Sequence, residues 1–203
     1  MSNPAEIDTI LLSFAESIDN VAARQSHLLQ RMTLELRQVR ENCGRLFIIG
    51  NGGGAAHATH AACDFRKIAG IESYSFDNMA ELTAEINDNG FMSSIKNWLK
   101  SSNLCAADAV MAISVGGGEG TGMVSPNLVQ AIDYAIWVDA RVLAIVGPRG
   151  GYAKQKADVC ITIPAPKHLE TPVTEGLQSV ILHALVSHST LALSKPKWES
   201  IGE

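Results

Sequence analysis

Hydrophobic residues recur every three to four positions over the first forty residues and then gather in short runs separated by glycine-rich or polar turns. The first pattern predicts one long helix, or two consecutive helices, over about residues 6–42. Five later apolar runs predict strands that alternate with stretches of helical spacing. The predicted strands cover residues 46–49, 71–75, 109–114, 141–146 and 159–163, and the predicted helices cover 55–68, 78–87, 91–101, 126–138, 150–156 and about 172–192.

The alternation of strands and helices predicts an α/β fold with a five-stranded parallel sheet, doubly wound so that helices cover both faces. Ligands of such folds bind outside the carboxyl ends of the strands. Without repeats or a linker, we expect one domain over residues 1–203, with a helical segment at about 4–43 and an α/β core at about 44–195.

Composition narrows the function classes. The 203 residues are 46% hydrophobic, enough for one full core, and the net charge of −5 without a basic block argues against nucleic-acid binding. The N-terminus lacks the features of a signal peptide and no apolar run reaches membrane-spanning length, so we expect a cytoplasmic protein. The cysteines lack a C-x-x-C pair and are expected to be free thiols; they are Cys43, Cys63, Cys105 and Cys160.

The segment from Leu46 to Asp64 is the most informative. An apolar strand ends in the glycine cluster Gly50–Gly54, and a helix follows at once. Glycines allow close approach of the backbone to a ligand, and the start of a helix attracts anions. His60 and Asp64 stand four positions apart on this helix, so both project from one face. We therefore expect chemistry on a phosphorylated small molecule.

A second glycine cluster, Ser114–Gly122, also follows a strand, and Ser125 is the expected N-cap of the next helix, with Pro126 at its first position. Neither loop contains lysine or arginine, and the P-loop motif is missing, so hydroxyls and amides binding a sugar phosphate fit better than a nucleotide triphosphate. Two flexible turns without a ligand are the alternative.

A dinucleotide site is a further alternative, because Gly50-x-Gly52-x-x-Ala55 loosely matches the Rossmann fingerprint and Glu72 lies near the expected distance for the ribose-binding acid. The long preceding helix and the polar helix after the turn argue against it. On the last helix, Glu175 and His183 are eight positions apart and within about 80° of each other around the axis. A histidine on an apolar helix is more often structural, as we expect for His168 and His188.

Together these residues resemble the sugar isomerase (SIS) domain family, and within it the sedoheptulose 7-phosphate (phosphoheptose) isomerases. The resemblance runs from the N-terminal helix to about Leu191 and is most specific at Gly50-Asn51-Gly52-Gly53 with His60 and the acid at position 64. Further matches are Asp77-Asn78, Asn87–Phe91, the Ser114/Ser125 loop, Gly147-x-x-Gly150-Gly151, and Glu175 with His183.

The resemblance implies a three-layer SIS fold, a homotetramer with active sites at subunit interfaces, and conversion of sedoheptulose 7-phosphate to D-glycero-D-manno-heptose 7-phosphate for surface-polysaccharide precursors. It implies Asp64 and His183 as the acid/base pair, and a zinc site in some members. The zinc ligands would be His60, Asp64, Glu175 and His183, one carboxylate then having to release the metal to act as base. The substrate-binding residues would be Asn51, Gly52, Gly53, Asp77, Ser114, Gly116, Gly117, Ser125 and Glu175.

Three positions depart from the family pattern. The acid is the shorter Asp64 where glutamate is common, Gly54 replaces the serine that usually ends the first turn, and the second loop loses serines and carries the insertion Glu119–Val124. Phosphate binding would then depend more on backbone amides, and the sugar could differ. A non-catalytic SIS module that binds a sugar phosphate or assembles with a protein is the alternative function, and the acid/base residues favour the enzyme.

Overall fold

The computed structural model describes residues 6–120 and 124–201. The central part of the inserted loop at Glu119–Val124 lies outside these residues, although the Glu119 N–H donates to the Val124 carbonyl across it. The elements in chain order are α1 (Ile7–Glu41), β1 (Arg45–Gly50), α2 (Gly53–Lys67), β2 (Glu72–Ser75), α3 (Met79–Asn89), η1 (Phe91–Ser93), α4 (Ser94–Ser101), β3 (Ala109–Ser114), α5 (Pro126–Trp137), β4 (Arg141–Val146), α6 (Gly151–Lys156), β5 (Val159–Thr162), η2 (Lys167–Leu169), α7 (Glu170–Val186) and η3 (Trp198–Ser200).

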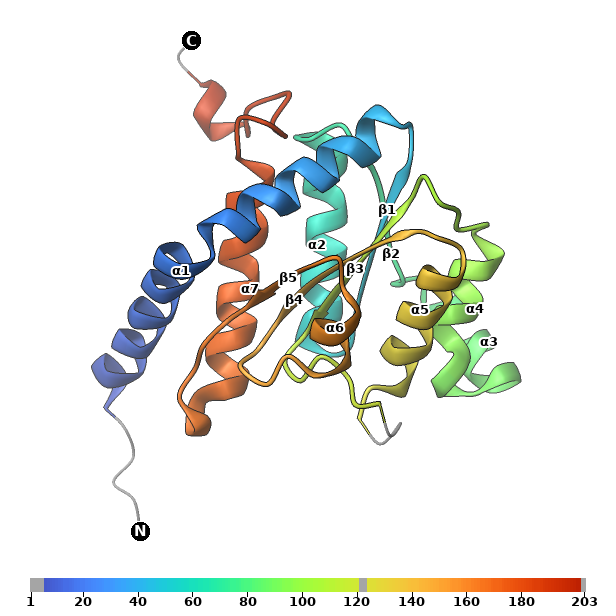
Figure 1. Cartoon of the computed structure of the whole chain (residues 1–203), viewed down its shortest axis with the longest axis horizontal. Coiled ribbons are helices and arrows are strands. Elements are labelled where there is room, and N and C mark those ends of the chain that lie inside the picture. The colour runs from blue at the N-terminus through green and yellow to red at the C-terminus, as the bar shows by residue number, and fades with distance from the viewer. Residues whose placement is uncertain (1–5, 121–123, 202–203) are drawn as a thin grey trace.

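The predicted doubly wound fold is confirmed. Five parallel strands lie in the order β2-β1-β3-β4-β5, and helices cover both faces of the sheet (Figure 1). Alternate strand residues point to opposite faces, and so they join two separate hydrophobic clusters. One cluster packs α1, α2 and α7 against the sheet, and the other packs α4, α5 and α6. The chain leaves β1 toward β2 on one side and reaches β3 on the other, so the topological switch point lies between β1 and β3.

The N-terminal segment is one continuous helix of 35 residues. Its buried residues, apart from Ser17 and Val21, lie between Met32 and Val39, whereas Ile7, Leu11 and Leu12 near its start are exposed. Within the described part of the chain, no helix is both long and apolar enough to span a membrane.

The last helix is shorter than predicted, because α7 ends at Val186 and not near residue 192. The sequence that follows is polar, and the Nδ1 atom of His188 accepts a hydrogen bond from the Thr190 N–H at 3.1 Å. Such local bonds between a side chain and the backbone compete with the helical ladder, which explains the early end.

At the amino edge of the sheet, two aspartates fix the start of a neighbouring strand in the same way. Asp108, just before β3, accepts the Arg45 N–H at 2.8 Å and binds the Arg45 guanidinium, with Nη2 to Oδ2 at 2.7 Å. Asp158, just before β5, accepts the Val142 N–H at 2.8 Å and the Arg141 guanidinium at 3.0 Å. These pairs are called the amino-edge clamps below.

A phenol–carboxylate contact joins α6 to α5. The Tyr152 hydroxyl donates to Asp133, and this hydrogen bond, with burial and the carboxylate charge, raises the pKa of Tyr152 to about 12. We expect Asp133→Asn to lower that pKa toward its ordinary value, because the acceptor charge is lost while burial remains. Absorbance titration of tyrosinate measures this change. The surface variant Asp139→Asn should leave the titration unchanged, and a wild-type curve in Asp133→Asn would contradict the assignment.

Candidate active site

The first glycine turn lies at the switch point, where β1 passes into α2. A Cβ atom on Gly54 would lie 2.4 Å from the Ile113 carbonyl oxygen of β3, so only glycine permits this approach without a shift. Gly52 has φ +56°, and a side chain there would meet open space. The turn therefore needs glycine both for packing and for its backbone conformation, and it leaves room for a ligand at Gly52.

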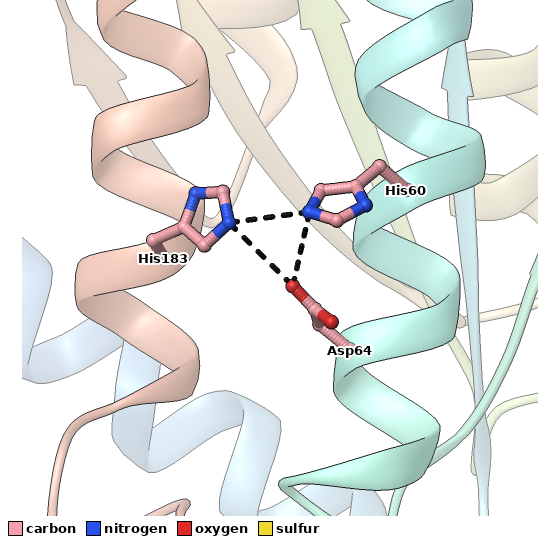
Figure 2. A group of neighbouring side chains, drawn as sticks. All are labelled: His60, Asp64 and His183. Carbon is pink, nitrogen blue, oxygen red and sulfur yellow. Dashed lines mark hydrogen bonds and ion pairs between the residues drawn. The ribbon is translucent and has the colours of Figure 1, made fainter. Parts of the chain in front are cut away.

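His60, Asp64 and His183 converge between α2 and α7 (Figure 2). The two Nε2 atoms of His60 and His183 are 3.2 Å apart, and the Asp64 Oδ2 atom lies 3.3 Å from the first and 3.7 Å from the second. Both imidazoles are more than half exposed, with side-chain exposures of 60% for His60 and 52% for His183. The sequence predicted that His60 and Asp64 share a face, and the packing of α7 on α2 adds His183.

A backbone contact fixes the tautomer of His183. Its Nδ1 atom lies 2.8 Å from the Ser179 carbonyl oxygen, an acceptor that requires a proton on Nδ1. In the neutral ring the Nε2 atom therefore presents a lone pair toward His60 and Asp64. This lone pair can accept a proton or bind a metal ion.

The three ligand atoms suit a zinc ion in spacing and chemistry. Tetrahedral zinc with bonds of about 2.0–2.2 Å holds its ligand atoms roughly 3.3–3.6 Å apart, close to the 3.2, 3.3 and 3.7 Å measured between these atoms. Two imidazoles and one carboxylate are also a ligand set typical of catalytic zinc, with a fourth position left for water or substrate.

Glu175, the fourth ligand implied by the resemblance, is not part of this cluster. A Cβ atom on Gly53 would lie 2.6–2.7 Å from the carboxylate atoms of Glu175, which places that carboxylate against the start of α2. Glu175 and His183 are separated by a rise of about 12 Å along a helix, so their side chains would have to point toward each other to share an ion. In this structure three of the four implied ligands lie together.

Asn51 is held by a residue that the sequence analysis missed. The carboxamides of Asn51 and Asn127 exchange two hydrogen bonds, at 3.0 and 2.8 Å. Asn127 is 1% exposed, and its Oδ1 atom also accepts the Leu128 N–H at 3.0 Å. That backbone donor fixes which atom of Asn127 is oxygen, and so fixes the orientation of Asn51 as well. One N–H of Asn51 then stays outside the pair and can bind a ligand oxygen.

The expected capping by Ser125 is wrong. Helix α5 begins at Pro126 as predicted, but Ser125 has φ +50° and its hydroxyl makes no capping hydrogen bond. The Asn127 side chain and the Ser125 carbonyl accept the Leu128 N–H that a serine cap would bind. The Ser125 hydroxyl is therefore not committed to the helix.

A cavity of about 480 Å³ opens beside the first glycine turn. Its polar lining residues are Asn51, Gly52, Ser94, Ser125 and Asn127. Its apolar lining comes mostly from the α3–α4 region, with Phe76, Leu82, Ile86, Phe91 and Ile95. Asp77, expected to contact the sugar, is exposed just before α3, where it accepts a hydrogen bond from the Ser75 hydroxyl at 2.8 Å.

The second glycine loop interlocks with the loop after β4. The carbonyls of Gly117 and Gly118 accept the Ala153 and Tyr152 N–H groups, and a Cβ atom on Gly117 would lie 2.0 Å from the Gly150 carbonyl oxygen. The Ser114 hydroxyl accepts the Gly117 N–H at 3.0 Å. Gly117 thus has a structural role, whereas a side chain on Gly116 would meet open space.

The same interlock places a cation from the loop after β4 beside the second glycine loop, although neither glycine loop contains a lysine or arginine. Arg149 lines a hollow of about 260 Å³ with Gly116 and Gly118. Its side chain is 70% exposed and pairs with Glu170 at 3.1 Å. No local signal in the sequence could place Arg149 here, because its position depends on the contact between two distant loops.

We expect Asn127→Leu to lower the free energy of unfolding by about 2 kcal/mol, because the Asn51 carboxamide loses both hydrogen bonds. The Michaelis constant for a sugar phosphate should rise about tenfold, since Asn51 is no longer oriented. Chemical denaturation and steady-state kinetics measure the two effects. Asn97→Leu, which removes one amide bond to Glu85, is the matched control, and an unchanged Michaelis constant in Asn127→Leu would contradict the positioning role.

Known proteins resemble this chain over most of its length. No model of a known protein family matches the chain. A phosphoheptose isomerase of Chlorobium phaeobacteroides is 30% identical over 167 residues, which cover 78% of this chain and 70% of that protein. The lincomycin biosynthesis protein LmbN of Streptomyces lincolnensis is 33% identical over 159 residues, covering 72% of this chain but only 56% of that longer relative. The structure of the phosphoheptose isomerase of Neisseria gonorrhoeae is 24% identical, with a TM-score of 0.75 over 88% of this chain and 95% of that one.

Proposed function

Since this chain belongs to the phosphoheptose isomerases of the SIS family, we propose that it is an aldose–ketose isomerase acting on a sugar phosphate, with sedoheptulose 7-phosphate as substrate and D-glycero-D-manno-heptose 7-phosphate as product. The observation that carries the proposal is the convergence of His60, Asp64 and His183 within 3.7 Å of one another. An isomerase needs a group that removes a carbon-bound proton and a group that moves protons between two oxygens, and this cluster offers both.

Asp64 is the base in the proposed reaction. Its Oδ2 atom contacts both imidazoles, whereas among the described residues its Oδ1 atom has no hydrogen-bond partner. Oδ1 takes a proton from C1 of the ketose, an enediol forms, and the proton returns to C2 to give the aldose. When no zinc is bound, the Nε2 atom of His183 moves the hydroxyl proton between O1 and O2, and His60 orients both groups. A bound zinc ion would occupy that Nε2 atom and would polarise O1 and O2 instead.

The remaining residues of the proposed site hold the substrate. The phosphate is bound by the N–H of Asn51, by the hydroxyls of Ser114 and Ser125, and by the backbone at Gly52, Gly53 and Gly116. Gly117 contributes by fixing the loop. Glu175 and Asp77 bind sugar hydroxyls.

Zinc is the proposed metal ion, held by His60, Asp64 and His183. When bound, zinc polarises oxygens of the substrate and stabilises negative charge that develops on them. We expect one zinc ion per chain by elemental analysis and at least a hundredfold loss of zinc affinity in His60→Ala, because one of three ligands is removed. His27→Ala is the control for loss of an exposed histidine, and equal zinc binding by the wild type and His60→Ala would contradict the site.

A homotetramer is the proposed assembly. The catalytic imidazoles are largely exposed, and Ile7, Leu11 and Leu12 on α1 present apolar side chains to solvent. A second copy would cover both features. Light scattering coupled to gel filtration measures the mass, and a monomer at micromolar concentration would contradict this assembly.

The proposed reaction is tested by following sedoheptulose 7-phosphate by NMR, with and without a chelator and added zinc. Formation of the aldose phosphate supports the proposal. Binding of the sugar phosphate without turnover supports the non-catalytic module, and turnover of another phosphorylated ketose alone would retain the reaction class and change the sugar.

A further inference from the structure

A second cavity, of about 400 Å³, lies between α1 and the edge strand β5. It shares no lining residue with the cavity at the first glycine turn or with the His60 cluster. Its volume falls in the range of small-molecule sites. Two cations line it, Arg24 from α1 and Lys154 from α6, and no acidic residue does.

The two positive charges are not neutralised by their neighbours. The residues three and four positions from Arg24 on α1 are Asn20, Val21, His27 and Leu28, none of them acidic. The carboxylate four positions after Lys154, Asp158, is used by Arg141 and the Val142 N–H. Among the described residues neither cation lies within 4 Å of a carboxylate. In a chain of net charge −5, such a pair of cations points to an anionic ligand.

Hydrogen bonds between α1 and β5 hold two walls of this cavity together. The Gln25 carboxamide donates to the Thr162 carbonyl at 2.6 Å and accepts the Thr162 N–H at 2.9 Å, which ties α1 to β5. The stem of Lys154 passes over Gly150, where a Cβ atom would lie 2.4 Å from Cδ of the lysine. The positive charge of Lys154 also reaches Cys160, another lining residue. Burial raises the pKa of that thiol, and a hydrogen bond with Thr162 and, to a smaller extent, the lysine charge oppose the rise.

We propose that this cavity binds a small phosphorylated metabolite at a site separate from the reaction centre. Arg24 and Lys154 bind the phosphate, because a guanidinium and an ammonium are the groups that proteins use for this anion. The side chains of Asn20 and Gln25 add polar groups near the charge. Leu28, Pro148 and Pro164 line the rest of the cavity and contact the carbon part of the ligand. The site does not depend on the proposed isomerase activity.

Cys160 allows a test that is specific to this cavity. The protein is labelled with iodoacetamide, and the labelling rate of each cysteine is read by peptide mass spectrometry at increasing inorganic phosphate or increasing sugar phosphate. We expect either anion to slow labelling of Cys160 at least threefold and to leave the exposed Cys105 unchanged. If the sugar phosphate protects Cys160 more strongly than inorganic phosphate does, the ligand is an organic phosphate. If the two protect equally, the ligand is free phosphate, and the proposed contact between the cavity and the carbon part of a ligand is wrong.

The variants Arg24→Gln and Lys154→Gln should each weaken this protection about tenfold in phosphate concentration, since one charge-assisted contact is lost. Arg37→Gln, which removes an exposed arginine paired with Glu41, should behave as the wild type. The proposal is overturned if anions leave the rate at Cys160 unchanged or if both cation variants retain full protection. If Cys160 reacts too slowly to follow, calorimetric titration of the wild type and of Arg24→Gln with inorganic phosphate replaces the labelling, and equal binding by the two proteins or no binding by the wild type overturns the proposal. None of these measurements uses isomerase activity. The anion site can therefore fail while the proposed isomerase reaction stands, and the reverse.

Discussion

Alanine at position 183 is expected to lower kcat about a thousandfold with a sugar phosphate substrate. The Nε2 atom of His183 is the proposed proton carrier in the metal-free site and a zinc ligand when zinc is bound, and loss of a general acid/base alone costs about a hundredfold to ten-thousandfold. The fold should persist, because the side chain is half exposed and a substitution at such a position changes the free energy of unfolding by about 0.5 kcal/mol or less. Steady-state kinetics and thermal unfolding measure the two quantities.

His168→Ala is the matched control for His183→Ala, because His168 is exposed and belongs to the short helix η2. It should keep the activity of the wild type. Wild-type kcat in His183→Ala would remove this histidine from the mechanism, and a loss of kcat that accompanies unfolding would assign it a structural role.

Removal of the Asp108 carboxylate is expected to cause the largest loss of stability. Its side chain is 2% exposed and accepts hydrogen bonds from the Arg45 backbone and guanidinium and from the Cys105 N–H. Asp108→Ala leaves the two backbone donors without this acceptor, and the Arg45 guanidinium keeps only the Ser102 and Asn103 carbonyls. We therefore expect a loss of about 3 kcal/mol in the free energy of unfolding. Urea denaturation measures it. Asp158→Ala removes the more exposed clamp and should cost less, and equal costs would contradict the role of burial.

The cost of Asp108→Ala should depend on pH. Burial raises the pKa of Asp108, but the hydrogen bonds from the Arg45 side chain and from the backbone of Arg45 and Cys105 lower it by more, so the pKa lies below its ordinary value of 3.8. A lowered pKa stabilises the folded state above the unfolded-state value and loses this contribution as the pH falls through the folded-state value. The difference between wild type and Asp108→Ala should therefore be constant above about pH 5 and shrink below about pH 4. A difference that stays constant to pH 2 would contradict this assignment.

The fold could be predicted because each strand and helix has its own hydrophobic period, which can be seen within a short stretch of sequence. All five strands lie within about one residue of their predicted bounds, and the largest error among the helices is at the polar end of the last one. The i, i+4 relation of His60 and Asp64 is likewise local, since it needs only a helix. Their meeting with His183 depends on how α7 packs on α2, and only the family resemblance suggested it.

The errors at the site arise where distant loops meet. The angle around the helix and the family resemblance both suggested Glu175 as a partner of His183, but its carboxylate lies against the start of α2, outside the cluster of His60, Asp64 and His183. Asn127 and Arg149 could not be assigned, because their neighbours Asn51 and Gly116 belong to loops that follow other strands. The Asn127 side chain also explains why Ser125 does not cap its helix. Contacts between loops are not encoded in periodicity.

The amino-edge clamps have an evolutionary consequence. They hold the sheet at its amino edge. The glycine loops and the proposed substrate site lie at the opposite edge, at the carboxyl ends of the strands. Sequence drift in the loops therefore need not weaken the clamps, and departures such as Gly54 and the insertion at Glu119–Val124 could accumulate while the scaffold persisted. Selection for a new sugar could then act on one edge of the sheet, with the opposite edge as a reserve of stability.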